Sequence, residues 1–397
     1  MLRVAVAGAG AFGRNHLRVY RELETAGAGV GLVAAVEPNE ARAAEAAAEY
    51  GIPVFATVDK LLAADLKLDA ASVAVPTVHH HAVASPLLDA GLDLLVEKPL
   101  AATLAEADDL LARAAKAGRV LQPGHLERFN PAVLAIAPTL RRPMFFEAHR
   151  LSVFTPRALD VDVVLDLMIH DLDIVLTFAN SAVREVRAVG LPILSPKVDI
   201  ANVRVEFESG CVANFTASRV STERVRKLRF FEPRQYVSID YARQDLLVIR
   251  IDAGAGRTSP AELIASLPPR VRAMLPPRIA EGIAAGKIDL KKIDPAVIAQ
   301  FATMAGIDPA VIAQAMSAAT GTGDAKPGLS FSKPVVTPGE PLRLEIVSFL
   351  DSVRTRRPAQ VTARQGRDAL ALALEIQAAM EAHAKRAGLE DFFSPGA

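Results

Sequence analysis

The sequence has a single cysteine, no long apolar run and no net charge, and each of these features argues against a class of protein. Cys211 is the one cysteine among 397 residues, so no intramolecular disulfide can form and a reducing compartment, the cytoplasm, is expected. No stretch approaches the ~18 uncharged apolar residues of a membrane span. The 45 basic and 45 acidic residues cancel, which gives no electrostatic reason to expect nucleic acid or an anionic membrane as a partner. Small soluble ligands are the expected partners instead.

The length predicts about two domains, and the first begins with a glycine-rich turn. An apolar strand from Leu2 to Ala7 leads into Gly8-Ala9-Gly10-Ala11-Phe12-Gly13, which opens a helix. In this GxGxxG pattern Gly8 permits the tight turn, Gly10 lets a pyrophosphate approach the backbone, and Gly13 allows the helix to pack closely on the strand. The pattern predicts a dinucleotide-binding domain over residues 1–122.

The second strand, Val30 to Val36, ends at an acid that bears on the choice of cofactor. Glu37 stands about where a carboxylate grips the adenine ribose hydroxyls of NAD, and its charge would repel the 2′-phosphate of NADP. Arg42 could soften that repulsion. The alternative is that Glu37 serves only the dipole of the following helix. NAD is the expected cofactor.

Further strands alternate with helices, which predicts a doubly wound parallel sheet. The fourth strand ends at Pro76-Thr77, and three consecutive histidines, His79 to His81, follow it. Side chains at a helix start point in different directions, so a polar helix start that touches the cofactor is favoured over a metal site. No metal is expected.

The fifth strand stops on an acid, a base and a proline at Glu97-Lys98-Pro99. Ligands bind beyond the carboxyl ends of the strands in an open parallel sheet, so Lys98 is expected in the ligand crevice. The pKa of a lysine falls readily on desolvation, which suits a proton relay or a group that stabilises an alkoxide. A solvated lysine at a loop start is the alternative. A sixth strand ends at Gln122, where the first domain is expected to close.

The segment from His125 to Pro131 is dense with polar groups just past this strand, as expected of a site at a domain junction. Arg128 offers a fork of donors that suits a phosphate, and Asn130 or His125 could hold sugar hydroxyls. The alternative for Asn130-Pro131 is simply a helix start.

A helix predicted from Asp160 to Phe178 carries Asp166 and His170 four residues apart, so both project from one face. The carboxylate can hold the imidazole or a substrate hydroxyl, while His170 takes a proton near neutral pH. A surface contact is the alternative. Asp171 and Asp173 lie on other faces of this helix and are expected to be solvated.

Consecutive strands between Glu185 and Asp252 predict a mostly antiparallel sheet in a second domain, residues 123–397. One face is expected to carry the helix of His170. The other is expected to be covered by a second subunit, because a broad sheet face would otherwise expose apolar surface. Arg219 and Arg226 belong to a cluster of arginines. Some of these side chains would be needed to bind an acidic part of a ligand.

A helical insertion is expected at about 259–327, where the segment Ile293–Gln300 recurs as Ile307–Gln314. Asp before Pro in each copy predicts a helix N-terminus. Two copies are too few for a solenoid, so the pair is interpreted as a lid or an oligomer contact. A Gly/Pro-rich loop, a helix from Pro341 to Arg354, and a strand at Val361 leading to a helix that ends near Ala387 complete the chain.

With GAGAFG at Gly8, Glu97-Lys98-Pro99, and Asp166 with His170 in this order, most of the chain resembles the glucose-fructose oxidoreductase/inositol dehydrogenase/MocA family. The resemblance implies an α/β fold with an N-terminal Rossmann doubly wound parallel sheet and a C-terminal α+β domain with an open, mostly antiparallel sheet. It implies homodimers or homotetramers formed through that sheet, and a nicotinamide bound between the domains. The family's Pro-Asn pattern on strand four reads Pro76-Thr77 here.

Within the family, residues 124–131, 216–221 and 226–229 are similar to enzymes that oxidise the 3-hydroxyl of UDP-N-acetylglucosamine. This resemblance implies a UDP-sugar substrate and a ketone that a partner aminotransferase converts to an amine for lipid A or related glycans. Oxidation of a free sugar or cyclitol is a competing hypothesis, and NAD sensing without turnover is another. Retention of the three catalytic candidates speaks against sensing, because binding alone does not need them.

These patterns and the resemblance together define the candidate site residues. The catalytic candidates are Lys98, His170 and Asp166. The NAD-binding candidates are Gly8, Gly10, Ala11, Phe12, Gly13, Glu37, Pro76, Thr77, His80, Glu97, Lys98 and Gln122. The substrate-binding candidates are Lys98, His125, Arg128, Phe129, Asn130, Asp166, His170, Arg219 and Arg226.

Overall fold

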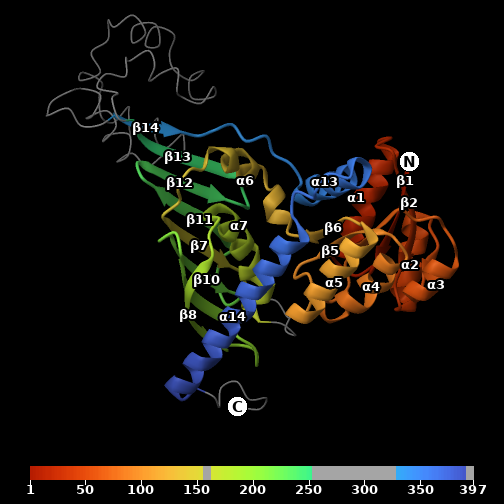
Figure 1. Ribbon diagram of the computed structural model, residues 1–397, viewed down its shortest axis with the longest axis horizontal. Helices are drawn as coiled ribbons and strands as arrows, with labels where there is room; N and C mark the ends of the chain where they lie inside the picture. Colours follow the sequence, from red (N-terminus) through yellow and green to blue (C-terminus); the bar gives the residue numbers. More distant parts are fainter. Residues whose placement is uncertain (155–161, 253–327, 390–397) are drawn as a thin grey trace, which may run out of the picture.

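The computed structural model describes residues 1–154, 162–252 and 328–389, which form two sheets with their helices (Figure 1). The helical insertion expected at about 259–327, with its repeated segments Ile293–Gln300 and Ile307–Gln314, lies outside the described residues. In the described ranges every helix is too short or too polar to cross a bilayer.

The N-terminal sheet is parallel, with the strand order β3-β2-β1-β4-β5-β6. This order, in which the direction of winding reverses beside β1, is that of a dinucleotide-binding fold. Its strands are β1 (Leu2–Ala7), β2 (Val30–Val36), β3 (Val54–Phe55), β4 (Ala70–Val73), β5 (Asp93–Glu97) and β6 (Leu121–Gly124). Its helices are α1 (Gly13–Thr25), α2 (Glu40–Tyr50), α3 (Val58–Ala63), the 3-10 turn η1 (Thr77–His79), α4 (His80–Asp89) and α5 (Leu104–Ala117).

The second sheet has eight strands in the order β14-β13-β12-β11-β7-β10-β9-β8. All neighbours are antiparallel except β7 and β10, so the expectation of a mostly antiparallel sheet is confirmed. Its strands are β7 (Phe145–Leu151), β8 (Val183–Leu191), β9 (Ile200–Phe207), β10 (Val212–Ser218), β11 (Val225–Glu232), β12 (Gln235–Asp240), β13 (Asp245–Asp252) and β14 (Gly328–Ser332).

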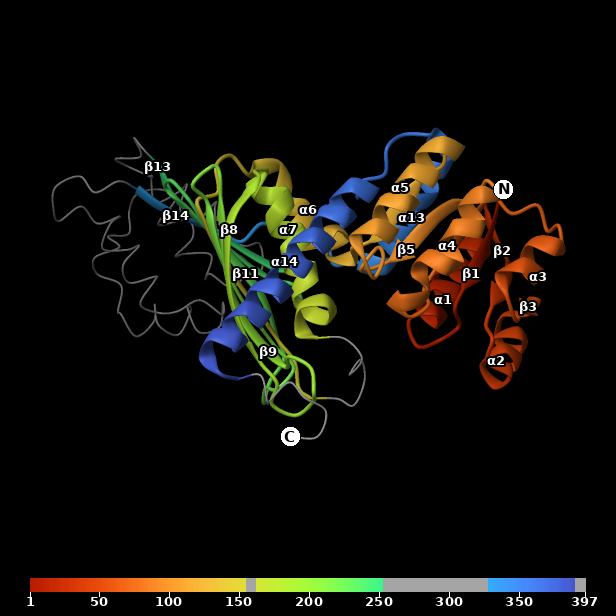
Figure 2. The ribbon, with the colours of Figure 1, turned by 60° about the horizontal axis from the view of Figure 1, so that its bottom comes forward.

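Helices cover one face of this sheet. Figures 1 and 2 show α7 (Ile169–Ala179) and α14 (Ala363–Ala387) lying along it. Alternate strand residues on that face, such as Phe146, Phe215 and Phe230, are buried in the core with both helices. Among the described residues, no helix covers the opposite face. The remaining short elements are η2 (Leu126–Phe129), α6 (Pro131–Ile136), η3 (Ala137–Thr139) and η4 (Val164–Met168).

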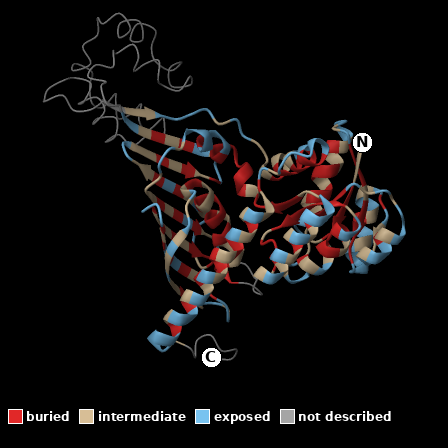
Figure 3. Ribbon diagram, viewed as in Figure 1, coloured by how far each residue is buried: buried red, intermediate tan, exposed pale blue. Residues whose placement is uncertain are grey.

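Helix α13 (Pro341–Thr355) returns from the second sheet to the first domain (Figure 1). Its residues Ile346 and Phe349 are fully buried in the same core as Leu17 and Tyr20 of α1. The buried core of the first domain, visible in Figure 3, therefore includes a helix that lies more than 300 residues after α1 in the sequence. No single position in the sequence therefore divides the chain into the two domains.

Two features of the second domain differ from the sequence prediction. Strand β7 was not anticipated, and it lies in the middle of the sheet, where its parallel partner β10 is far away in the sequence. Strand β14 occupies part of the stretch expected to be a Gly/Pro-rich loop. The strand expected at Val361 is absent from the structure there, because Thr362 begins α14 directly by capping it through the backbone N–H of Gln365.

We predict that Phe349→Ala lowers the free energy of unfolding by roughly 3–5 kcal/mol, because it leaves a cavity in the shared core of α1 and α13. Chemical denaturation followed by circular dichroism measures this. Val347→Ala on the same helix is the matched control, since Val347 is 42% exposed and its loss should cost below about 0.5 kcal/mol. Equal effects of the two changes would contradict the docking of α13.

Candidate active site

Lys98 joins the two domains at the end of β5. Its ammonium Nζ donates a hydrogen bond of 2.6 Å to the backbone oxygen of Asp166 and lies 3.7 Å from the carboxylate Oδ1 of the same residue. Burial lowers the pKa of Lys98, and the carboxylates of Asp166 and Glu97 act in the opposite direction. Lys98 thus lies between the carboxyl end of β5 and η4, the region in which the ligand crevice was expected.

His170 lies in the first turn of α7, but the helix before it is not the continuous α-helix that was expected. Val164–Met168 form a π-helical turn, η4, and α7 begins at Ile169. Such π-turns are frequent at functional sites because they re-aim side chains. No hydrogen bond joins the Asp166 carboxylate to the His170 ring, whose Nδ1 is buried without a partner among the described residues.

Burial is the main reason that the pKa of His170 lies well below its ordinary value, and the positive charges of Lys98 and Arg150 lower it further. The imidazole is therefore neutral at pH 7 and able to accept a proton. Lys98 contacts Asp166, four residues before His170 in the chain, and its charge is one of those that lower the pKa of His170.

Arg150 on β7 is a buried residue of this centre that the sequence prediction missed. Its Nε and Nη2 donate to both carboxylate oxygens of Asp171, at 2.7 and 3.1 Å, and its Nη1 donates to Glu127 at 3.1 Å. The expectation that Asp171 and Asp173 are solvated was wrong, because both are almost fully buried. Alternation along the strand would have indicated Arg150, which shares an inward face with Phe146 and Ala148.

The polar segment after β6 is largely structural, which corrects several substrate-binding expectations. Asn130 caps α6 by accepting a hydrogen bond from the Ala132 N–H, which agrees with the alternative prediction that Asn130-Pro131 is a helix start. Its side-chain amide donates to the Tyr241 carbonyl. Phe129 is buried in the protein. Arg128, expected to bind a phosphate, is buried and pairs with Asp173 and with the Thr177 hydroxyl.

Arg219 and Arg226 have different environments. Arg219 is buried and its Nε donates to Asp199 at 2.7 Å, so this guanidinium holds β9 and β10 together rather than facing an open site. Arg226 pairs in register with Arg150 across β7 and β11, and its side chain is exposed. Its charge contributes to the low pKa of His170. Arg226 is thus the arginine that remains available for an anionic substrate.

The glycine turn has the shape that a pyrophosphate requires. A Cβ at Gly13 would lie 1.9 Å from the Gly8 carbonyl oxygen, and one at Gly8, which has φ of 97°, would lie 2.6 Å from the Ala74 carbonyl oxygen. Gly10 has open space around it. Ala11 and Phe12, which follow, are exposed at the start of α1. These observations fit the predicted cofactor contacts.

A cavity of about 500 Å³ beside this turn fits an adenosine. It is lined by Gly8, Gly10, Glu37, Arg42 and Pro76, among others. The Glu37 carboxylate accepts from the Ala9 and Asn39 N–H groups, at 3.0 Å each, and from Arg42 at 2.8 Å. Although burial opposes ionisation, these bonds hold the pKa of Glu37 below its ordinary value. Glu37 is therefore ionised at the position expected for the ribose.

His80, predicted to touch the cofactor, is instead a buried link in the protein. Its ring nitrogens lie 2.8 Å from the Pro99 carbonyl and 2.9 Å from the Val75 carbonyl, so it fixes the segment around Lys98. His79 lines the cofactor cavity and His81 contacts Asp109, so the three histidines have different surroundings. Thr77, at the start of η1, is half-buried.

A set of buried polar groups lies at the ends of β5 and β6 and on the helices that pack there. Glu97 binds His16 of α1 at 2.9 Å, while Gln122 donates weakly to the Glu345 backbone oxygen at 3.4 Å. His125 is buried and neither of its ring nitrogens has a partner among the described residues. Such atoms require water or a ligand. His125 and Gln122 therefore fit the expectation that a bound molecule reaches this junction.

Glu345 on α13 is a buried acid that the sequence prediction also missed. Both carboxylate oxygens lack a partner among the described residues. Burial, followed by the negative charges of Glu97 and Asp173, raises the pKa of Glu345 well above its ordinary value, so folding favours the protonated form of this group. An acid on the apolar stripe of Leu342, Ile346 and Phe349 was the available signal.

Comparisons with known proteins agree with this geometry. Residues 2–125 match the model of an oxidoreductase family with an NAD-binding Rossmann fold, and residues 138–234 match the GFO/IDH/MocA C-terminal domain. UDP-N-acetylglucosamine 3-dehydrogenase of Acidithiobacillus ferrooxidans is 38% identical over 254 residues, which is 64% of this chain and 78% of the relative. A solved structure of that enzyme matches with a TM-score of 0.73 and 30% identity, and the match covers 96% of this chain and 98% of the other.

A more distant relative is the NAD-dependent scyllo-inositol 2-dehydrogenase of Bacillus subtilis, 27% identical over 55% of this chain and 68% of the relative. The fold and the site together define an NAD-dependent oxidoreductase that acts on CH–OH groups. The chain belongs to the Gfo/Idh/MocA family.

We predict that Glu37→Ala weakens NAD binding roughly ten- to one-hundredfold, because charge-assisted hydrogen bonds to the ribose are lost. Arg42, released from Glu37, should in turn improve binding of NADP relative to NAD. Isothermal titration of both cofactors measures this. Glu40→Ala, an exposed acid in the first turn of α2, is the control and should change neither affinity. An unchanged preference in Glu37→Ala would contradict the assignment.

We predict that Glu345→Gln is increasingly more stable than the wild type as pH rises above the ordinary glutamate pKa. In that range the unfolded chain has released the Glu345 proton and the folded chain retains it, so wild-type stability falls with pH, by at most about 1.4 kcal/mol per pH unit from this group. Urea denaturation at pH 4.5, 6 and 7.5 measures the difference. Glu375→Gln, at an exposed position on α14, should show no such trend.

Proposed function

We propose that this enzyme oxidises the 3-hydroxyl of a UDP-N-acetylhexosamine, with UDP-N-acetylglucosamine as the substrate that similarity favours. The observation that carries the chemistry is the hydrogen bond from Lys98 of the first domain to the backbone of Asp166, four residues before His170 of the second domain, whose pKa is lowered by burial and by the charge of Lys98. A hydroxyl placed between them would face a proton acceptor and a positive charge together.

NAD, when bound, supplies the acceptor for the hydride that leaves the sugar carbon. The residues of this chain handle the proton and the charge. His170 accepts the hydroxyl proton at Nε2, since Nδ1 is the buried nitrogen. Lys98 stabilises the negative charge that develops on the same oxygen, and its backbone bond to Asp166 fixes the direction of the ammonium group. The Asp166 carboxylate is left to orient a neighbouring sugar hydroxyl.

Arg226 supports a substrate that carries a diphosphate. It is exposed on the helix-covered face of the sheet, next to the buried Arg150, and its guanidinium has no partner among the described residues. A planar guanidinium binds phosphoryl oxygens through two parallel hydrogen bonds. A free cyclitol offers no anion for this side chain, so Arg226 favours a nucleotide sugar over the inositol-like alternative.

The product of this reaction, a 3-keto sugar nucleotide, is the natural substrate of an aminotransferase, and lipid A or a related glycan is the proposed destination of the resulting amine. We also propose a homodimer or homotetramer built on the open face of the second sheet, where no described helix lies (Figure 2). Analytical ultracentrifugation of the full chain tests that assembly.

The proposed function is tested by absorbance of reduced nicotinamide, with NAD and UDP-N-acetylglucosamine, in the presence of a 3-keto sugar aminotransferase that removes the ketone. Formation of NADH with this substrate and not with myo-inositol supports the proposal. Turnover of myo-inositol, without turnover of the sugar nucleotide, would establish that the enzyme oxidises a cyclitol instead. Binding of NAD without turnover of any sugar nucleotide would establish a sensor.

We predict that Lys98→Ala lowers kcat roughly a hundredfold or more, because the developing alkoxide loses its positive partner. Steady-state kinetics at saturating NAD measures this. Lys116→Ala, an exposed position on α5, is the control and should retain full turnover. Near-normal kcat in Lys98→Ala would remove Lys98 from the mechanism.

A further inference from the structure

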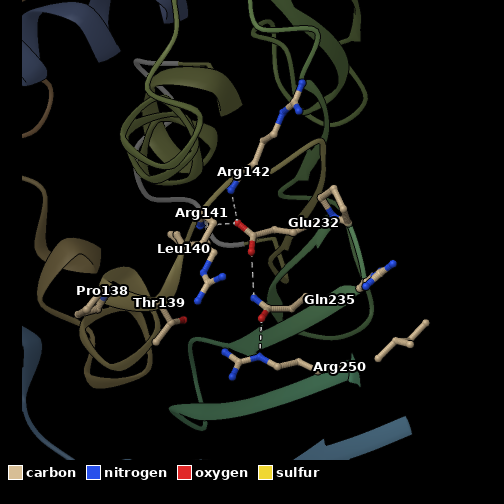
Figure 4. Close-up of a pocket in the computed structure, with 11 residues that line it drawn as sticks. Pro138, Thr139, Leu140, Arg141, Arg142, Glu232, Gln235 and Arg250 are labelled. Carbon is tan, nitrogen blue, oxygen red and sulfur yellow. Dashed lines mark hydrogen bonds between the residues drawn. The ribbon is translucent and has the colours of Figure 1, made fainter. Parts of the chain in front are cut away.

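A second cavity, of about 710 Å³, lies in the second domain between the loop after η3 and strands β11 to β13 (Figure 4). One wall is the loop after η3, and the other is the hairpin between β11 and β12 together with the end of β13. Four of its eleven lining residues are arginines and one is acidic, while prolines and leucine or isoleucine side chains supply apolar surface. The cavity is thus strongly positive and large enough for a nucleotide-sized molecule.

The guanidinium groups of this cavity are not neutralised by its one acid. The Glu232 carboxylate accepts from the backbone N–H groups of Arg141 and Arg142, at 2.8 and 2.9 Å, and from the Gln235 amide at 3.2 Å. Arg250 uses only its Nε, which donates to Gln235 at 2.6 Å. Among the described residues, no acid pairs with the side chains of Arg141 or Arg234. Their donors are free for an incoming anion.

Figure 4 shows how three of these side chains are directed. Arg141 extends alongside the Glu232–Gln235 pair and Arg250 lies at the Gln235 end of it, so both extend toward the space between the loop and the strands. Arg142 contributes its backbone to Glu232, but its side chain extends away from that space. Neighbouring arginines in one loop therefore have different roles, which provides a matched pair for experiment.

The backbone at Arg234 limits which substitution can test its side chain. Arg234 has φ of 67°, in the left-handed region, at the second position of the turn that joins β11 to β12. A turn of this kind with proline before it favours glycine or asparagine there, because a Cβ is strained. Arg234 is one of six described non-glycine residues with positive φ, so a substitute that tolerates this conformation, such as asparagine, is needed to remove its charge without disturbing the turn.

This cavity is separate from the active centre. Arg226 and Glu232 lie on the same face of β11, six residues apart, which corresponds to roughly 20 Å along a strand. The diphosphate of a sugar nucleotide bound at Lys98 and Arg226 therefore does not extend into it.

We propose that this cavity binds the diphosphate group of a second phosphorylated small molecule, distinct from the substrate. Three guanidinium forks, from Arg141, Arg234 and Arg250, match the several oxygens and the multiple charge of a diphosphate better than a single phosphate or carboxylate. The apolar residues Leu140 and Ile251 provide contact for the remainder of such a molecule.

Isothermal titration of the full chain with inorganic pyrophosphate tests this proposal. The double variant Arg141→Gln/Arg234→Asn should bind at least about tenfold more weakly than the wild type, because two charge-assisted contacts are lost. Asparagine tolerates the left-handed conformation, so the turn and the melting temperature should be kept. Turnover of the sugar nucleotide should also be unchanged.

Arg142→Gln is the control, with the same change of charge in the same loop, and its affinity should remain within about twofold of the wild type. Absence of pyrophosphate binding by the wild type overturns the proposal. So does undiminished binding by the double variant, which would place the anion elsewhere, or an equal loss in Arg142→Gln, which would indicate bulk electrostatics. None of these outcomes depends on whether the enzyme acts on UDP-N-acetylglucosamine.

Discussion

The hydrogen bond from Lys98 Nζ to the backbone oxygen of Asp166 is the contact on which the active centre depends. It crosses from the end of a fully buried strand in one domain to the π-helical turn of the other. A backbone acceptor cannot rotate away, so it fixes the ammonium group where the two domains meet. The same π-helical turn leads into α7 and sets the position of His170. This bond therefore ties the ammonium group to the segment that carries the proton acceptor.

The electrostatics of the junction follow from this placement. Burial, with the charges of Lys98 and Arg150 added to it, lowers the pKa of the His170 imidazole, while buried carboxylates limit the cost of holding the two cations out of water. Asp171 and Glu127 neutralise Arg150 directly. The raised pKa of Glu345 disfavours a further negative charge at the junction. The result is a centre where protons can be exchanged without exposing an unpaired charge.

Much of the site could be predicted because its chemistry is local in the sequence. The glycine turn, Glu37 and Lys98 each follow a strand end directly, so a short motif fixes their place. Arg150, Asp171 and Glu345 could not be found in this way, because their roles arise from pairing between distant segments. Asn130 shows the opposite error: a residue type suited to sugar binding serves as a helix cap, and only its partners distinguish the two. Similarly, α13 joins the first core only through tertiary packing.

The central claim is that Lys98 and His170 act on one oxygen atom, and a double-mutant cycle in kcat tests it most directly. The variants are Lys98→Met, His170→Gln and the combination, measured at saturating NAD and sugar nucleotide. Groups that act on the same transition state give non-additive losses, so the double variant should be about as slow as the slower single variant. A double variant whose loss equals the product of the two single losses would show that the groups act independently and would contradict the account.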